Sequence, residues 1–169
     1  MSRRVRIVPP DPEWPQHFQR FKRHIQETLG KTPIEHMGST SVPGLGAKNF
    51  IDIMAGVPDR ETADRYQKQL EKAGYTDVTP EPGHQEWFYC LSTVDRNPGV
   101  HLHLVITGSS HWKRQLAFRD ILRADPEIAG EYYKLKKFLA EKHGSDREAY
   151  TDAKTEFIEE TLRKAGTPV

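Results

Sequence analysis

The stretch that decides the fold is residues 36–53, which read HMGSTSVPGLGAKNFIDI. It begins at the end of a short apolar segment, residues 34–37, which we interpret as a strand. A loop rich in Gly, Ser, Thr and Pro follows over residues 38–47. The run from Phe50 to Val57 is apolar except for one charge, Asp52, which is typical of a buried strand. The pattern therefore predicts a strand, a glycine loop and a second strand that carries a single carboxylate.

The glycine loop is a candidate phosphate-binding element. Glycines let backbone N–H groups approach a ligand closely, and Ser39, Thr40 and Ser41 add three hydroxyl groups. The loop lacks the Gly-x-x-x-x-Gly-Lys-[Ser/Thr] spacing of a Walker A motif. A tight surface connection has the same composition, so the loop alone leaves both interpretations open.

Four side chains are candidates for a centre beside this loop. A carboxylate within an apolar strand, such as Asp52, needs a hydrogen-bond partner or a metal ion. His101 and His103 are two residues apart in an expected strand, so both rings lie on the same side of it. His36, just before the loop, is a candidate for the same centre. A hydrogen-bonded aspartate at a strand end and a solvent-facing histidine pair are the alternatives.

The rest of the chain predicts a mixed architecture. Strands are expected at residues 34–37, 50–57, 75–79, 86–92 and 100–107. Helices are expected to begin at or after Asp11, Asp59, Ser109 or Ser110, Asp125 and Ser145. The fold class is therefore α+β, or mixed α/β, with helices beside a sheet. We expect one domain over residues 1–169, with a sheet-bearing part over about 1–108 and a helical part over about 109–169.

Composition places the chain among ordinary globular proteins. Its 169 residues include 25 Lys and Arg and 24 Asp and Glu, and this near-zero net charge of +1 gives no strong sign of nucleic-acid binding. Cys90 is the single cysteine, so neither an intramolecular disulfide nor a Cys-based metal cage is expected. No run of about 18 apolar residues and no signal-peptide pattern is present, so we expect a cytoplasmic protein without a membrane partner. The oligomeric state is left open.

The order of loop and aspartate resembles that of the polymerase-beta type nucleotidyltransferases. In that superfamily a Gly-Ser turn holds the nucleotide triphosphate, and the next strand carries two carboxylates, as Asp-x-Asp or Asp-x-Glu, that hold divalent metal. A closer resemblance, over nearly the whole chain, is to the GrpB family of nucleotidyltransferase-like proteins. Besides residues 36–53, it rests on VPPDPEWP at 8–15, HLHLV at 101–105 and FRD at 118–120.

The resemblance implies a nucleotidyltransferase-like mixed sheet flanked by helices, and a set of site residues. A nucleotide or another phosphorylated small molecule would be bound by Gly38, Ser39, Thr40, Ser41, Lys48, His36 and Arg119. From the residues themselves, we expect Asp52, His101 and His103 to be catalytic and to hold a divalent metal ion, Mg²⁺, Mn²⁺ or Zn²⁺.

Position 54 departs from the catalytic pattern of the superfamily. Met54 stands where the second carboxylate belongs, and a thioether is a poor ligand for Mg²⁺. Glu81 and Glu86 are candidates for a replacement acid. Three functions stay open: nucleotidyl or phosphoryl transfer through the Gly-Ser loop and Asp52, a nucleotide-binding module without turnover, and a His/Asp metal-dependent enzyme of another class.

Overall fold

The computed structural model describes residues 4–80, 87–93 and 95–168 and contains a five-stranded mixed sheet. Its strands are β1 (Ile34–Met37), β2 (Phe50–Val57), β3 (Thr76–Asp77), β4 (Tyr89–Ser92) and β5 (Gly99–Ile106). They lie in the order β1-β2-β5-β4-β3. β2 and β5 are parallel, whereas the other neighbouring pairs are antiparallel. Residues far apart in the sequence therefore meet at the centre of the sheet.

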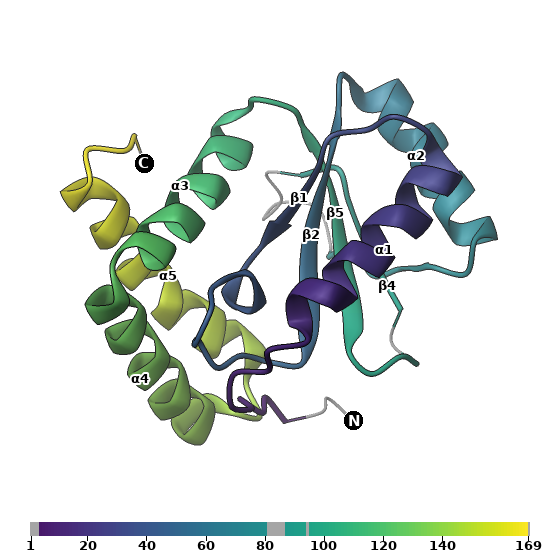
Figure 1. Ribbon diagram of the computed structural model, residues 1–169. Coiled ribbons are helices and arrows are strands. Elements are labelled where there is room, and N and C mark those ends of the chain that lie inside the picture. Colours follow the sequence, from purple (N-terminus) through teal and green to yellow (C-terminus); the bar gives the residue numbers. More distant parts are fainter. Residues whose placement is uncertain (1–3, 81–86, 94, 169) are drawn as a thin grey trace.

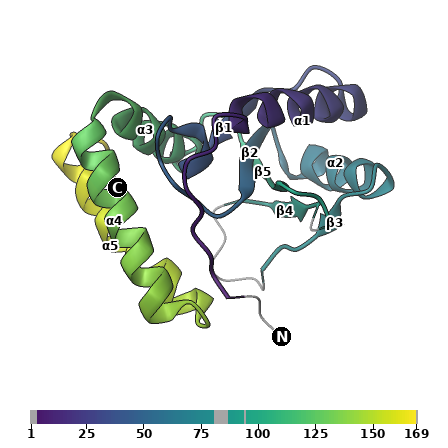
Figure 2. The same ribbon diagram turned by 60° about the horizontal axis from the view of Figure 1, so that its bottom comes forward.

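Two groups of helices lie on opposite sides of the sheet (Figures 1 and 2). The helices are α1 (Trp14–Leu29), α2 (Arg60–Lys72), α3 (Ser110–Ala124), α4 (Pro126–His143) and α5 (Arg147–Lys164). Figure 2 shows α1 and α2 on one side and the C-terminal group α3–α5 on the other. The predicted fold class, α+β with a mixed sheet and a helical C-terminal region, is confirmed.

Alternation along the two central strands decides which side chains form the core. Ile51, Ile53, Leu102 and Leu104 have no solvent exposure and belong to the core cluster that includes residues of α1 and α2. Because successive side chains of a strand point to opposite faces, residues 52, 54, 101 and 103 take the other face. That face is only partly covered by the C-terminal helices, and this leaves space for a ligand.

Three predicted helix caps are confirmed, and two helix starts are corrected. The carboxylates of Asp59 and Asp125 and the hydroxyl of Ser109 accept hydrogen bonds from backbone N–H groups of the first helical turn, as expected of N-caps. α1 begins at Trp14, because the Asp11 carboxylate accepts a hydrogen bond from the N–H of Glu13 and closes a turn before the helix. α5 is capped by Asp146, one residue after the predicted Ser145.

The predicted strands agree with the structure at the centre of the sheet and differ at its edge. β1 and β2 have the predicted bounds, and β5 is shifted by one residue toward the N-terminus. β3 has only two residues instead of the predicted five. The predicted strand 86–92 is observed from Tyr89, and residues 81–86, which include Glu81 and Glu86, lie outside the described residues. In the described ranges, no helix has the length and apolar character needed to cross a membrane.

Candidate functional site

Asp52 and His101 form a pair at the centre of the open face of the sheet. They are register partners on the parallel strands β2 and β5, and Asp52 Oδ1 lies 3.5 Å from His101 Nδ1. About a third of each side chain is exposed. Burial raises the pKa of Asp52, but the hydrogen bond and charge of His101 and the charge of His103 outweigh it, so the pKa lies below its ordinary value. Asp52 is therefore an ionised carboxylate in a site that solvent reaches.

His101 is held in place by a ring contact as well as by its partner. Its imidazole stacks on Phe50, with ring centroids 4.3 Å apart and an interplanar angle of 14°. Since Nδ1 faces Asp52, the carboxylate orients the ring, and Nε2 is the nitrogen left for another contact. The predicted convergence of Asp52 and His101 on one centre is thus seen in the structure.

The turn at Gly38 brings the glycine loop against Asp52. Gly38 has φ +69°, and a Cβ at this position would lie 2.5 Å from Oδ2 of Asp52, so both the conformation and the space require glycine. The loop continues as one 3-10 turn over Ser39–Ser41. Ser41 closes the turn, because its hydroxyl donates a hydrogen bond to the Gly38 carbonyl at 2.5 Å. The Gly38–Ser39 turn and Asp52 therefore belong to one site, as the resemblance implies.

Lys136 of α4 fixes both ends of this loop. Its ammonium group donates hydrogen bonds to Ser39 Oγ at 2.6 Å and to the Gly46 carbonyl at 2.5 Å. The residue is only 3% exposed, and its Nζ lies 5.1 Å from the centre of the Tyr132 ring. Burial and the charge of Lys154 lower the pKa of Lys136 to about 7. The sequence offers Lys136 as a possible positive charge for phosphate, beside an apolar stripe of a later helix where a surface lysine is the more common interpretation. Nothing in its local pattern shows that it reaches the loop.

Two further lysines are coupled to the same carboxylate. Nζ of Lys48 lies 4.7 Å from the centre of the Tyr150 ring, and Nζ of Lys154 lies 4.6 Å from it. Burial, together with the charge of Lys48, lowers the pKa of Lys154 to about 8, while Asp52 opposes the shift. The pKa of Lys48 is also lowered by burial and raised by Asp52. We call Lys48, Lys136 and Lys154 the lysine triad; the charge of Asp52 raises the pKa of each of the three, against the larger effect of burial.

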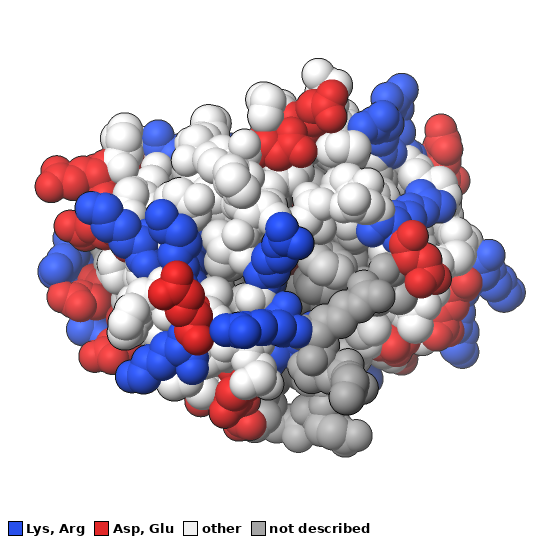
Figure 3. All heavy atoms as spheres, turned by 90° about the horizontal axis from the view of Figure 1, so that it is seen from below, with Lys and Arg blue, Asp and Glu red and all other residues white. Residues whose placement is uncertain are grey.

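Positive charge is also visible on the surface. On the face seen from below, Lys and Arg side chains gather near the middle and to its left (Figure 3). Asp and Glu side chains lie among them and along the edges of this face, so positive charge is concentrated only near its middle.

A cleft of about 250 Å³ opens between the sheet and the C-terminal helices beside Asp52. Gly38, Ser39 and Lys154 line it together with Asp52. The remaining lining residues are mostly aromatic, aliphatic or imidazole-bearing: Met37, Trp87, His103, His111, Gln115, Phe118, Arg119, Leu122, Tyr132 and Ile158. The cleft therefore combines charged groups with aromatic and aliphatic ones, a combination that suits small polar ligands with a hydrophobic part.

His103 lines the cleft beside Trp87 and Cys90. Its ring meets Trp87 edge to face at 5.0 Å, and its Nε2 lies 4.0 Å from Cys90 Sγ. Its Nδ1 is buried without a hydrogen-bond partner in the structure. Burial lowers the pKa of His103 to about 4, so the ring is neutral at physiological pH. His103 thus shares the face of Asp52, two register pairs further along the strands.

His36 and Thr40 do not join this centre. His36 alternates to the opposite face of the sheet, where it stacks on Phe18 of α1 with ring centroids 4.6 Å apart. Its Nε2 and Thr40 Oγ1 are hydrogen-bonded at 2.9 Å, and both residues are buried. Burial lowers the pKa of His36 to about 4. The structure therefore gives these two predicted phosphate ligands a role in attaching the loop to the core.

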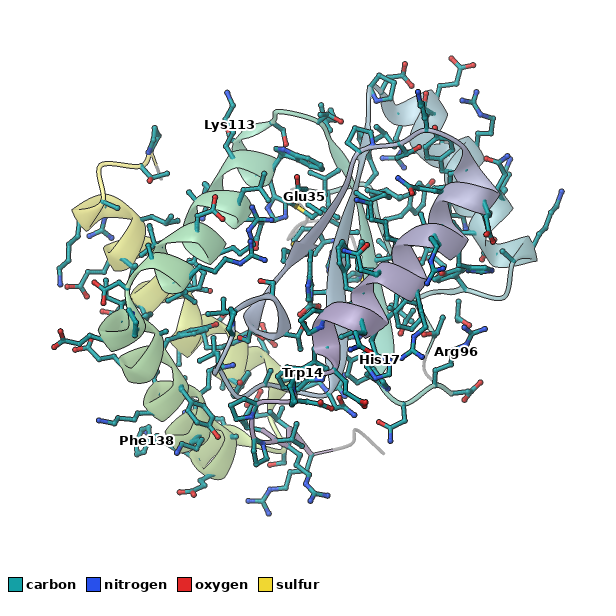
Figure 4. The ribbon with its side chains drawn as sticks, viewed as in Figure 1. Trp14, His17, Glu35, Arg96, Lys113 and Phe138 are labelled. Carbon is teal, nitrogen blue, oxygen red and sulfur yellow. The ribbon has the colours of Figure 1, made fainter. Side chains whose placement is uncertain are left out.

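Arg119 lines the cleft, and its guanidinium group is hydrogen-bonded to other groups of the protein. Its guanidinium donates to the Glu35 carboxylate at 2.8 Å, to the Asp120 carboxylate at 2.8 Å and to the His36 carbonyl at 3.1 Å. Figure 4 shows Glu35 between β1 and α3, where this contact joins them. Arg119 therefore connects α3 to the sheet at the edge of the cleft.

The residues of the site do not fit a pair of magnesium ions. Met54 has no solvent exposure and packs in an apolar cluster with Met37, Val105 and Trp112. A thioether in that cluster cannot replace the second carboxylate as a hard oxygen ligand. Among the described residues, no group of three or more His, Cys, Asp or Glu side chains is arranged to hold a metal ion. The predicted metal ligands Asp52, His101 and His103 share a face, yet they do not form such a group.

The fold resembles that of a poly(U) polymerase. The structure aligns with Cid1 poly(U) polymerase, in a crystal structure with MgGTP bound, at a TM-score of 0.54 over 80% of this chain and 44% of that one. The sequence identity is 14%, so this likeness concerns the fold alone.

The chain belongs to the GrpB family. The family model described as GrpB protein matches residues 4–164. The crystal structure of the conserved protein GrpB from Enterococcus faecalis aligns at a TM-score of 0.79 with 32% identity, and the match covers 95% of this chain and 99% of that one. The UPF0157 protein BH1888 of Halalkalibacterium halodurans is 36% identical over 163 residues, which are 95% of this chain and 82% of that protein. The predicted family is confirmed.

Proposed function

We propose that this protein binds a nucleotide or another phosphorylated small molecule in the cleft beside Asp52. One observation carries the proposal: Lys136 is hydrogen-bonded to Ser39 of the glycine turn, and Lys154 lines the cleft together with that turn and with several aromatic and aliphatic side chains. Phosphates are the ligands that ammonium groups and glycine turns favour, and the apolar side chains of the lining accept a base or another ring. The nucleotidyltransferase-like fold supports the same assignment by analogy.

Thermal unfolding with added ligands tests this proposal. ATP, GTP, CTP and UTP are compared with adenosine and with inorganic tripolyphosphate, which separate the contributions of ring and phosphates. At 100 times its dissociation constant a ligand adds about 2.7 kcal/mol to the free energy of unfolding. That corresponds to a rise of roughly 5–10 °C in the melting temperature for a chain of this size. We expect nucleotides to produce the rise and adenosine to produce little; no rise with any of these compounds would contradict the proposal.

A second candidate function is group transfer, and the Asp52–His101 pair favours it. We propose that an acceptor hydroxyl or water attacks the α-phosphorus of a bound nucleoside triphosphate. The new P–O bond forms as the bond to the β-phosphate oxygen breaks, and pyrophosphate leaves. His101 takes the acceptor proton, while Asp52 orients the imidazole and stabilises its protonated form.

Release of pyrophosphate from ATP, with water as acceptor, tests the second candidate. We expect His101→Gln and Asp52→Asn to abolish the release while the circular dichroism spectrum is unchanged. His17, a half-buried residue on α1 that is absent from the cleft lining, offers the matched control His17→Gln, which should keep full activity. Pyrophosphate release at the rate of a protein-free blank would remove this candidate and leave the binding function untouched.

A further inference from the structure

We propose that the lysine triad, and not divalent cations, neutralises the phosphates of the ligand in this cleft. The inference rests on the proposed binding function and says how that site works. It predicts that the ligand binds without metal.

The first argument is the loss of oxygen ligands on the sheet. In the two-metal pattern that the sequence resembles, a second carboxylate stands two residues after the first, on the same face of the strand. Here that position is Met54, which is fully buried among apolar neighbours. The register partner of Asp52 on β5 is His101, and the partner of Met54 is His103, so neither position on β5 supplies an oxygen atom. Asp52 is left as the single carboxylate among the cleft-lining residues that the structure describes.

The second argument is the gain of positive charge from three separate segments. Lys48 follows the glycine loop, Lys136 comes from α4 and Lys154 from α5. Each of the three is electrostatically coupled to Asp52, and Lys136 also contacts Ser39 at the turn. A divalent ion placed among three ammonium groups is repelled, whereas a polyphosphate is attracted. The pKa of Lys136 is about 7 and that of Lys154 about 8, and a bound polyanion favours the protonated form of both. Three ammonium groups against one carboxylate then give the excess of positive charge that a polyanion needs.

The third argument is that the ammonium groups are already positioned. Nζ of Lys136 lies 5.1 Å from the centre of the Tyr132 ring, and the Nζ atoms of Lys48 and Lys154 lie 4.7 and 4.6 Å from the centre of the Tyr150 ring. The three lysine side chains are therefore packed against rings, which restricts their conformations. The side chains that contact phosphate therefore lose their conformational entropy during folding and not during ligand binding. A site with preformed cations gains little from recruiting a metal ion.

Asp52 gives the sharpest test, because the two ways of neutralising phosphate predict opposite results for Asp52→Asn. If a metal ion bridges Asp52 and the phosphates, the variant loses binding. If the lysine triad is responsible, the variant removes the one negative charge that repels the phosphates, and binding tightens. We expect affinity for ATP to increase at least twofold in Asp52→Asn, with Asp52→Ala as a second variant that carries no hydrogen-bonding group. Isothermal titration calorimetry measures the change.

The same titrations are run with EDTA and with Mg²⁺ or Mn²⁺. We expect ATP and tripolyphosphate to bind in EDTA at least as tightly as with metal, since a metal ion reduces the charge of the free ligand. Lys154→Met should weaken binding at least tenfold and reduce its dependence on salt. Lys134→Met removes an exposed lysine from α4 and is the matched control; its affinity should equal that of the wild type.

The outcomes separate this inference from the function on which it rests. If neither ATP nor tripolyphosphate binds under any condition, the proposed function fails. If both bind only with metal and binding is lost in Asp52→Asn, the function stands and this inference is overturned. Undiminished binding by Lys154→Met, with a native circular dichroism spectrum, would also overturn it.

Discussion

The carboxylate of Asp52 fills the space that a side chain on Gly38 would need: a Cβ on residue 38 would lie 2.5 Å from Oδ2 of Asp52. The position of the Asp52 carboxylate therefore requires glycine at residue 38, and the glycine leaves the space that this carboxylate occupies. A loop without a side chain lets the carboxylate stand close to the backbone, where a phosphate bound by the turn would also be close to it.

This contact predicts that Gly38→Ala is costlier than Gly44→Ala, a substitution in the same loop. Gly38 and Gly44 both have positive φ, but a Cβ on Gly44 would meet no atom within 4 Å. We expect Gly44→Ala to lower the free energy of unfolding by about 1–2 kcal/mol, through backbone strain alone. Gly38→Ala adds a clash, so we expect a loss of about 3 kcal/mol or more. Urea unfolding measures both values, and equal losses would show that the contact with Asp52 is unimportant.

Restoring the carboxylate that the sequence lacks gives a second prediction. Met54→Asp buries an unpaired charge in an apolar cluster, so we expect it to lower stability by about 3 kcal/mol or more. Met54→Leu keeps volume and polarity and should cost less than about 1.5 kcal/mol. Because the new carboxylate shares a face with Asp52, Mn²⁺ should recover part of the loss in Met54→Asp. Melting curves with Mn²⁺ and with EDTA check this; no recovery would mean that the backbone at residues 52–54 cannot hold a metal ion.

Lys136 predicts a rise of stability with pH. In the folded protein, burial and the charges of Lys154 and Lys48 lower its pKa to about 7, against attraction by Asp52, from an ordinary value of 10.5. Between these values the unfolded chain holds a proton that the folded protein has released, so the free energy of unfolding increases as pH rises above about 7. We expect urea unfolding between pH 6.5 and 9 to show this increase and Lys136→Met to reduce it. Lys134→Met, which loses an exposed lysine of the same helix, should keep it; identical slopes in all three proteins would refute the assignment.

The Arg119–Glu35 pair predicts a measurable coupling between α3 and β1. The Arg119 side chain is 12% exposed and that of Glu35 is 38% exposed, so we expect a double-mutant cycle with Arg119→Met and Glu35→Gln to give about 1 kcal/mol. The Asp120 carboxylate binds the same guanidinium but is 59% exposed, so its cycle should give less than about 0.5 kcal/mol. Chemical unfolding of the single and double variants supplies the numbers. A larger coupling for Asp120 than for Glu35 would be inconsistent with the proposed role of Arg119.

The parts of the site that follow a local rule were predictable from the sequence. A strand has a period of two, which puts His101 and His103 on one face and makes Met54 the residue that accompanies Asp52. The same rule, applied to β1, puts His36 and Met37 on opposite faces. The position of His36 beside the loop suggested the same centre as Asp52, but the loop begins after Met37, which is the register partner of Asp52.

The part that the sequence did not predict depends on tertiary packing. Lys136 and Lys154 lie near apolar residues of their helices, a pattern that usually means a lysine stem along the surface with its head in water. Only the docking of α4 and α5 turns them toward the loop and brings Tyr132 and Tyr150 beside them. Strand order is equally non-local, because β5 lies beside β2 only after the chain has passed through α2, β3 and β4.

The hydrogen bond between Ser39 and Lys136 joins residues that are 97 positions apart. During synthesis at about 5–20 residues per second, Ser39 is therefore made roughly 5–20 s before its partner. In that interval the nascent chain has Gly38, Lys48 and Asp52 but neither Lys136 nor Lys154. The proposed binding site is thus completed late in the synthesis of each new chain, only when the C-terminal helices have been made.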